Sequence, residues 1–176
     1  FDVLIVDIFK CNYDIFIGDE KGKVVKQITK INGYDAEAVI SPNGDKILFT
    51  STRNGDLDLY LMDISGKNVK QLTSTLGYDG GASFSADGTK IVFSASRPSS
   101  ADTNQYKALL LNGFVAPTKL EIYTMNVDGT NLQQVTRLGN SNRTPVFNPS
   151  GNKIIFSSNH YSDKGNDFQL FMINVD

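Results

Sequence analysis

Several residue types that build common functional sites are scarce in this chain of 176 residues. It contains one cysteine, Cys11, one histidine, His160, and no tryptophan. A single cysteine excludes a disulfide within the chain and any zinc site made of several cysteines, and a single histidine excludes every metal motif that needs two. The sequence therefore predicts neither a metal site nor a cofactor.

Long apolar runs and an excess of one charge are also missing. The longest apolar stretches, such as residues 3–6, have only about four residues, whereas a membrane-spanning helix needs about 18 or more. Lysine and arginine number 17 and aspartate and glutamate 19, which gives a net charge of −2. Because binding to nucleic acid by phosphate neutralisation requires a basic surface, we expect no nucleic-acid partner and no membrane span in this segment.

What the chain does contain is a set of short sequence words that recur in a fixed order. The words are residues 42–49, 86–93 and 149–156; residues 59–63, 122–126 and 170–174; and residues 27–29, 71–73 and 134–136. Equivalent residues lie 44 positions apart from Gly44 to Gly88 and 63 apart from Gly88 to Gly151. The 19 extra residues indicate an insertion between Arg97 and Leu120.

Each repeat has the pattern of four β-strands. Short runs of β-branched and aromatic residues alternate with Gly, Asn and Asp, which is typical of antiparallel hairpins. The expected strands are 38–41, 82–85 and 145–148; 46–52, 90–96 and 153–159; 58–64, 121–127 and 169–175, with 14–19 in an incomplete first copy; and 25–29, 69–73 and 132–136. The apolar period of two excludes an α-solenoid. Tandem four-stranded units of this length predict an all-β fold, a β-propeller with three to four blades in this segment.

We expect residues 1–176 to form one incomplete propeller domain. It comprises a partial blade at 14–29, a blade at 36–73, a blade at 80–136 with an insertion at 98–118, and a partial blade at 143–176. Because a propeller needs at least four blades to close, this organisation predicts a segment of a longer propeller, in which a glycine follows Asp176. On the first strands, Phe84, Phe147 and their equivalent Ile40 are expected to line the core between blades.

The repeated words resemble the WD-like propeller repeat of the TolB family. Its pattern Ser-Pro-Asp-Gly is matched by residues 41–44, Lys-Ile-x-Phe by 46–49, Ile-Tyr-x-Met-Asp by 59–63 and Leu-Thr by 72–73. The resemblance covers nearly all of residues 14–176. It implies a propeller, a periplasmic or otherwise extracytoplasmic location and a partner in the cell envelope. Similar repeats form the propellers of prolyl-oligopeptidase-type peptidases and of oligogalacturonate lyases, but the lyases bind a metal through several histidines that this chain lacks.

Strand order determines which loops share a face. The turns between first and second strands and between third and fourth strands lie on one face, which we call the tight-turn face. The remaining connections, including residues 53–57, 98–118 and 160–168, lie on the opposite face, which we call the loop-bearing face. Because function tends to reside on variable loops held by a rigid scaffold, the loop-bearing face is the candidate binding surface.

The candidate binding residues all belong to this face. They are Arg53, Arg97, His160, Tyr34, Tyr78, Asp35, Asp79 and Arg143, with Tyr106 and Phe114 in the insertion. Arg53, Arg97 and His160 occupy the same repeat position, directly after the second strand. One interpretation is ion pairing between arginine and aspartate of adjacent blades, and the other is a polar ligand-binding ring. No catalytic residue is assigned, because a lone histidine without a Gly-x-Ser-x-Gly motif indicates no catalytic triad.

The insertion has a helical pattern of its own. A short helix is expected from Asp102 or Thr103 to Asn112, with Tyr106 and Leu110 on one face. It forms either a lid on the propeller rim or a docking element for a partner. For the whole chain we expect a non-catalytic propeller that binds a protein or a polysaccharide-type ligand through the loop-bearing face. The alternative is an accessory propeller that gates an enzyme such as a prolyl-oligopeptidase-type serine peptidase.

Overall fold

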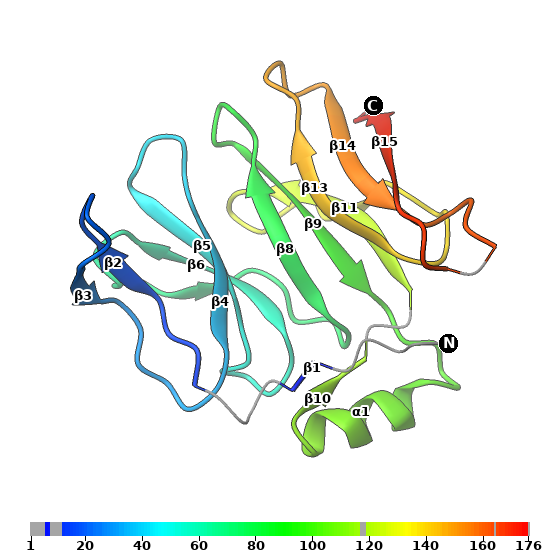
Figure 1. The fold of residues 1–176 in the computed structure, drawn as a ribbon, viewed down its shortest axis with the longest axis horizontal. Helices are drawn as coiled ribbons and strands as arrows, with labels where there is room; N and C mark the ends of the chain where they lie inside the picture. Colours follow the sequence, from blue (N-terminus) through cyan, green and yellow to red (C-terminus); the bar gives the residue numbers. More distant parts are fainter. Residues whose placement is uncertain (1–5, 8–11, 117–118, 164, 176) are drawn as a thin grey trace.

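The computed structural model describes residues 6–7, 12–116, 119–163 and 165–175, and it is built almost entirely of β-strands (Figure 1). The strands are β1 (Val6–Asp7), β2 (Phe16–Gly18), β3 (Val24–Gln27), β4 (Asp35–Ile40), β5 (Lys46–Ser51), β6 (Asp58–Asp63), β7 (Lys70–Gln71), β8 (Asp79–Phe84), β9 (Lys90–Ser96), β10 (Phe114–Val115), β11 (Leu120–Asn126), β12 (Gln133–Gln134), β13 (Asn142–Phe147), β14 (Lys153–Ser158) and β15 (Gln169–Asn174). The helix α1 spans Thr103–Leu111.

The strands form consecutive antiparallel sheets that stand side by side (Figure 1). Strands β4-β5-β6-β7 make a four-stranded sheet, blade 1, and β8-β9-β11-β12 make a second, blade 2. Strands β13-β14-β15 make a three-stranded sheet, blade 3, and β2-β3 form an N-terminal hairpin. This arrangement confirms the all-β class and the β-propeller architecture, in which β4, β8 and β13 are the first strands of their blades.

The first strand of each blade begins three residues earlier than expected. Its pairing with the second strand is interrupted by a register shift, at Ala36/Val39, Gly80/Ser83 and Arg143/Val146. Each shift contains a residue with positive φ, namely Glu37 at 55°, Gly81 at 60° and Thr144 at 50°. The bulge breaks the alternation of side chains, and therefore the sequence pattern placed the start of these strands too late. The fourth strands, β7 and β12, are instead shorter than expected, with two residues each.

Apolar side chains fill the space between successive sheets. On β5, Leu48 packs toward blade 2, whereas Ile47 and Phe49 pack toward the N-terminal hairpin. This alternation recurs on β9 and β14, and each buried side chain contributes roughly 1.5–3 kcal/mol. Phe84 and Phe147 pack into these cores as expected. The same expectation for Ile40 is wrong, because this side chain is 61% exposed on the side of the two-stranded N-terminal hairpin.

Two lysines tie successive blades together at the tight-turn face. Lys26 donates from Nζ to the backbone oxygen of Ser65 at 3.1 Å, and Lys70 donates to that of Asp128 at 2.8 Å. The two lysines are equivalent residues 44 positions apart, and each reaches the turn of the following blade. The repeat therefore encodes not only a blade but also its attachment to the next one.

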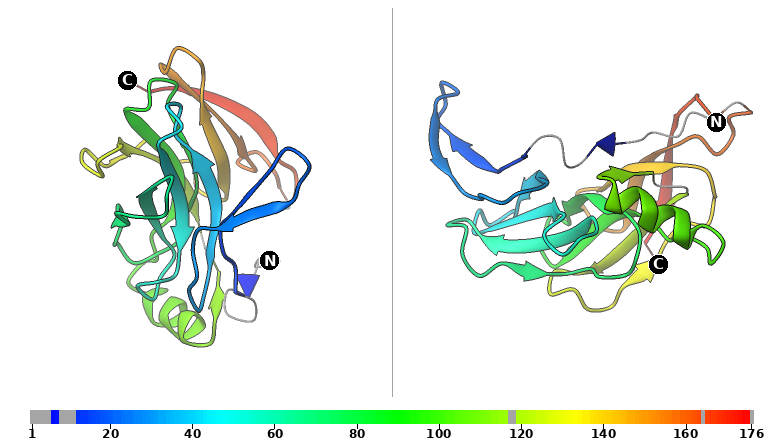
Figure 2. Two further views of the ribbon diagram at one scale, coloured as in Figure 1. Left: turned by 90° about the vertical axis from the view of Figure 1, so that its left-hand side faces the viewer. Right: turned by 90° about the horizontal axis from the view of Figure 1, so that it is seen from below.

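The insertion forms the predicted helix, which packs against the blades (Figure 1). Tyr106 of α1 is buried with Leu57 of blade 1 and with Val115 of β10. Val115 also pairs with Val6, so that β10 joins β1 to the insertion. Figure 2 shows α1 at one end of the sheets, on the loop-bearing face. In the described part of the chain, no helix has the length and apolar character that crossing a bilayer requires.

One face of blade 3 is apolar and uncovered among the described residues. Leu170 is 79% exposed and Met172 is 60% exposed, whereas Leu59 and Ile122, the equivalents of Leu170 in blades 1 and 2, are fully buried. The expectation that a further blade follows stays a prediction.

Candidate functional site

The two arginines that follow the second strands are held in ion pairs. Arg53 donates from Nη2 to both carboxylate oxygens of Asp35, at 3.0 and 2.9 Å. Arg97 Nη1 lies 2.7 Å from Asp79 Oδ1, and both aspartates are buried. Each pair lies within one blade, because the first and second strands are antiparallel and their ends meet. The expectation of pairing between adjacent blades was therefore wrong.

Both arginines also stack on aromatic rings of their own blade. The Arg53 guanidinium carbon lies 5.0 Å from the ring centre of Phe49 and 4.9 Å from that of Tyr60, and Arg97 lies 5.2 Å from Tyr123. These contacts combine charge neutralisation with cation–π attraction. A ligand that approached either arginine would compete with a buried carboxylate for the guanidinium.

Blade 3 lacks this ion pair, because Asn142 and His160 occupy the positions of the aspartate and the arginine. Asn142 is fully buried and donates from Nδ2 to the backbone oxygen of Leu120 at 2.7 Å. His160 Nδ1 lies 2.8 Å from the backbone oxygen of Leu138. Among the described residues the His160 ring forms no hydrogen bond with a side-chain nucleophile, so its geometry gives no base–nucleophile pair.

A cluster of acidic groups lies between blade 1, blade 2 and the helix of the insertion. Tyr106 donates from its hydroxyl to Asp56 Oδ1 at 2.7 Å, and burial together with this bond raises the pKa of Tyr106. Burial, followed by the charge of Asp56, raises the pKa of Asp58 to about 6. Burial raises the pKa of Asp79 to about 7, although Arg97 acts in the opposite direction. Tyr106 is thus a buried anchor of the insertion.

These acidic groups do not form a metal centre. Within residues 6–7, 12–116, 119–163 and 165–175, no group of three or more histidine, cysteine or acidic side chains is arranged to hold a metal ion. Phe114, the other candidate in the insertion, is half-buried on β10 and pairs with Asp7.

The first strands carry a second polar cluster, which includes Glu37, a residue that sequence reasoning missed. Its carboxylate accepts hydrogen bonds from Thr50 Oγ1 at 2.7 Å and from the backbone N–H of Gly81 at 2.9 Å. The Tyr78 hydroxyl lies 3.3 Å from Glu37 Oε1, so Glu37 links blade 1 to blade 2. No sequence signal indicated Glu37, because it lies just before the strand expected at 38–41.

Tyr34 lies beside this cluster, at the start of β4. Its ring centre is 5.2 Å from that of Tyr13, and the two residues pair as an isolated bridge. Burial, with a smaller contribution from the charge of Glu37, raises the pKa of Tyr34 to about 12. The fold brings the candidate tyrosines Tyr34 and Tyr78 together, since both pack against the cluster of Leu57, Tyr106 and Val115.

Arg143 and the loop between β14 and β15 form the third group. Arg143 donates from Nε to Ser141 Oγ at 2.5 Å, and its guanidinium carbon lies 5.8 Å from the ring centre of Phe168. Tyr161 in the same loop is 72% exposed and stacks on Phe171. Sequence reasoning missed Tyr161 and Phe168, since both lie in a loop that has no counterpart of similar sequence in the other repeats.

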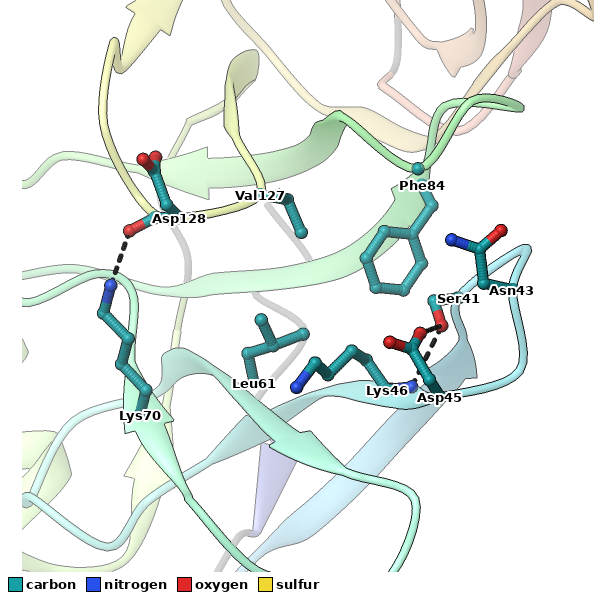
Figure 3. A pocket seen from close by; sticks show the side chains of 10 residues that line it. Ser41, Asn43, Asp45, Lys46, Leu61, Lys70, Phe84, Val127 and Asp128 are labelled. Carbon is teal, nitrogen blue, oxygen red and sulfur yellow. Dashed lines mark hydrogen bonds between the residues drawn. The ribbon is translucent and has the colours of Figure 1, made fainter.

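A groove of about 340 Å³ lies on the tight-turn face, between blades 1 and 2 (Figure 3). Leu61, Phe84 and Val127 line its apolar part, and Lys46 and Lys70 lie at its rim. Lys46 Nζ is paired with Asp63 at 2.5 Å, and Lys70 holds the turn of blade 2. Since both ammonium groups already have partners in the protein, we assign no ligand to this groove.

The fold and the repeated words agree with one protein family. Residues 3–108, more than half of the chain, match the model of the TolB beta propeller domain. The chain therefore belongs to the TolB beta propeller domain family. A comparison with curated protein sequences gives no significant match.

Solved structures with the same fold include two TolB-type proteins. TolB from Acinetobacter baumannii aligns with a TM-score of 0.69 and 24% identity, over 93% of this chain and 35% of that structure. A TolB-type structure from Agrobacterium tumefaciens aligns with a TM-score of 0.63 and 23% identity, over 88% and 50%. Hydrazine synthase from Kuenenia stuttgartiensis aligns with 0.60 and 16%, over 87% and 25%. The chain thus spans between a quarter and half of these structures.

Proposed function

We propose that this chain is part of a non-catalytic TolB-like propeller, which binds a protein of the cell envelope outside the cytoplasm through its loop-bearing face. Membership of the TolB beta propeller domain family supports the class of protein, the location and the class of partner. A polysaccharide-type ligand is the alternative for the same face. No observation on the described residues favours an accessory propeller of a peptidase.

One observation carries the choice of face: the elements that break the repeat lie on the loop-bearing face. They are the insertion with α1 and the loop between β14 and β15, where Leu111 is 88% exposed and Tyr161 is exposed as well. The tight-turn face presents the same glycine turn three times, at Gly44, Gly88 and Gly151. Exposed apolar groups on distinct, rigidly held loops are the features by which a surface selects a partner.

Site-specific photo-crosslinking tests this proposal. A photoreactive phenylalanine replaces Leu111 or Tyr161 in the chain, which is exported to the periplasm of a Gram-negative host and irradiated. We expect a crosslinked adduct with an envelope protein from both positions, identified by mass spectrometry.

Asn43 and Lys67 supply the matched controls, because both are exposed in turns of the tight-turn face. The same photoreactive residue at these positions is expected to give no such adduct. Adducts with a protein from Asn43 and Lys67 alone would show that the wrong face was chosen. Adducts with glycan alone would show that the partner is a polysaccharide and not a protein.

A further inference from the structure

Arg143 differs from Arg53 and Arg97, the two ion-paired arginines of the loop-bearing face. Arg53 and Arg97 are neutralised by buried aspartates, whereas no described carboxylate lies within ion-pair distance of the Arg143 guanidinium. Its Nε donates to Ser141, and its two terminal nitrogens have no hydrogen-bond partner among the described residues. The two terminal nitrogens of Arg143 are therefore free to donate hydrogen bonds to a ligand that approaches from solvent.

The position of Arg143 results from two linked departures from the repeat. In blades 1 and 2 the equivalent residues are Ala36 and Gly80, and a Cβ at Gly80 would collide with the Tyr78 hydroxyl and the Glu37 carboxylate. Blade 3 has a serine where the other blades have Tyr34 and Tyr78. The smaller side chain leaves room for an arginine and also supplies the acceptor that holds its Nε.

Further contacts fix the direction of the guanidinium. It lies against the ring of Phe168, which holds it on the side of the variable loop. The Glu37 carboxylate is already engaged by three donors and does not reach Arg143. The arginine is thus half-buried, oriented by an aromatic ring and left with a net charge.

The chemistry that suits such a group is a carboxylate. A planar guanidinium with two outer nitrogens matches the two oxygens of a carboxylate, and partial burial strengthens the pairing beyond that of an exposed ion pair.

Building on the proposed function, we propose that Arg143, supported by Ser141 and Phe168, is a recognition site for an acidic side chain on an extended segment of the partner protein. The guanidinium of Arg143 supplies the charge and the two outer donors that the acidic side chain pairs with. Tyr161, exposed in the same loop, gives the neighbouring residue of the peptide an aromatic surface.

Fluorescence anisotropy with a defined probe tests this site. The probe is a labelled peptide of alternating glutamate and valine, and its counterpart replaces each glutamate with glutamine. We expect the chain to bind the glutamate peptide at least tenfold more tightly than the glutamine peptide, and Arg143→Gln to abolish that difference. Arg143→Lys, which keeps the charge but not the fork, should fall between the two.

Arg137→Gln is the matched control, because it removes the same charge from an exposed arginine of the same face, in the connection between β12 and β13. It should leave binding within twofold of the wild type, and a thermal melt should show both variants folded. Three results would each overturn the site. The two peptides could bind with equal affinity, or both variants could lose the same amount of affinity. Trigalacturonic acid could also compete for the site as strongly as the unlabelled peptide does. Crosslinks from the loop-bearing face would still stand in those cases, whereas crosslinks confined to the tight-turn face would overturn the proposed function instead.

Discussion

At the scale of the residue, the same side chain has different roles in different repeats. Arg53 and Arg97 stabilise their blades, because each lies between a buried aspartate and an aromatic ring. Blade 3 shows that the ion pair is not obligatory, since Asn142 fills the position of the aspartate with a neutral amide. Removing one partner of the ion pair should therefore be costly, whereas both partners can be replaced together.

Arg97→Ala should destabilise the chain strongly at pH 8, where Asp79 is ionised. The substitution leaves a fully buried carboxylate without its cation, which costs on the order of 3 kcal/mol. Urea unfolding measures this loss. The double variant Asp79→Asn with Arg97→His, which copies the residues of blade 3, should lose markedly less. A single variant as stable as the wild type would contradict the role given to the pair.

Gly66→Ala tests the contact of a turn with the preceding sheet. Gly66 has a φ of 87°, and a Cβ there would meet the backbone oxygen of Ile28 at 3.0 Å. The equivalent Gly22 has a φ of 77° but nothing within 4 Å, so Gly22→Ala carries the backbone strain alone. We expect a loss of about 1–3 kcal/mol at Gly66 and a smaller one at Gly22. Equal losses by thermal denaturation would argue against close packing of the turn.

At the scale of the element, uninterrupted alternation made the second and third strands predictable. Ile47 and Phe49 alternate with Leu48 without a break, so strand limits and facing both followed from the sequence. The predicted first strands were too short because each contains a bulge. The bulge depends on a residue with positive φ, such as Glu37, and the alternation of apolar and polar residues does not reveal such a residue. For the site, the sequence located both the arginines and the aspartates but placed their pairing between adjacent blades, since pairing depends on which strand ends meet in space.

Phe84→Ala measures the core that a first strand contributes to its blade. Phe84 packs against the cluster between blades 1 and 2, so its removal should cost about 3 kcal/mol of unfolding free energy. Ile40→Ala is the matched control at the equivalent, exposed position and should cost below about 1 kcal/mol. Denaturant titration that gave similar losses for both variants would show that the facing of these strands is wrong.

The acidic cluster beneath α1 predicts a pH dependence. The folded state raises the pKa of Asp58 to about 6 and that of Asp79 to about 7, above their ordinary value of 3.8, so it binds protons that the unfolded state releases. The unfolding free energy should therefore fall as the pH rises from about 4 to 7, by several kcal/mol. Urea titrations at pH 5 and pH 8 measure the change, and Asp79→Asn should reduce it. A higher stability at pH 8 would contradict the raised pKa values of these two buried carboxyl groups.

At the scale of the whole molecule, the blades act as a scaffold and the two ends differ in character. The tight-turn face is uniform, because its turns and its lysine hydrogen bonds between blades recur from repeat to repeat. The loop-bearing face differs from repeat to repeat, because it carries the insertion and the loop of blade 3 (Figure 1). A repeat pattern in the sequence revealed this division, because an insertion is visible as a change of period. The identity of the exposed aromatic groups on the loops could not be derived from the repeat.

The most direct test of the account is the dissociation constant for the envelope protein captured by crosslinking, measured with two double variants. Leu111→Asp with Tyr161→Asp changes the loop-bearing face, and Asn43→Asp with Lys67→Gln changes the tight-turn face by the same net charge. Circular dichroism verifies that both remain folded. The account predicts at least tenfold weaker binding for the first variant and unchanged binding for the second. Unchanged binding by the first variant and weakened binding by the second would contradict it.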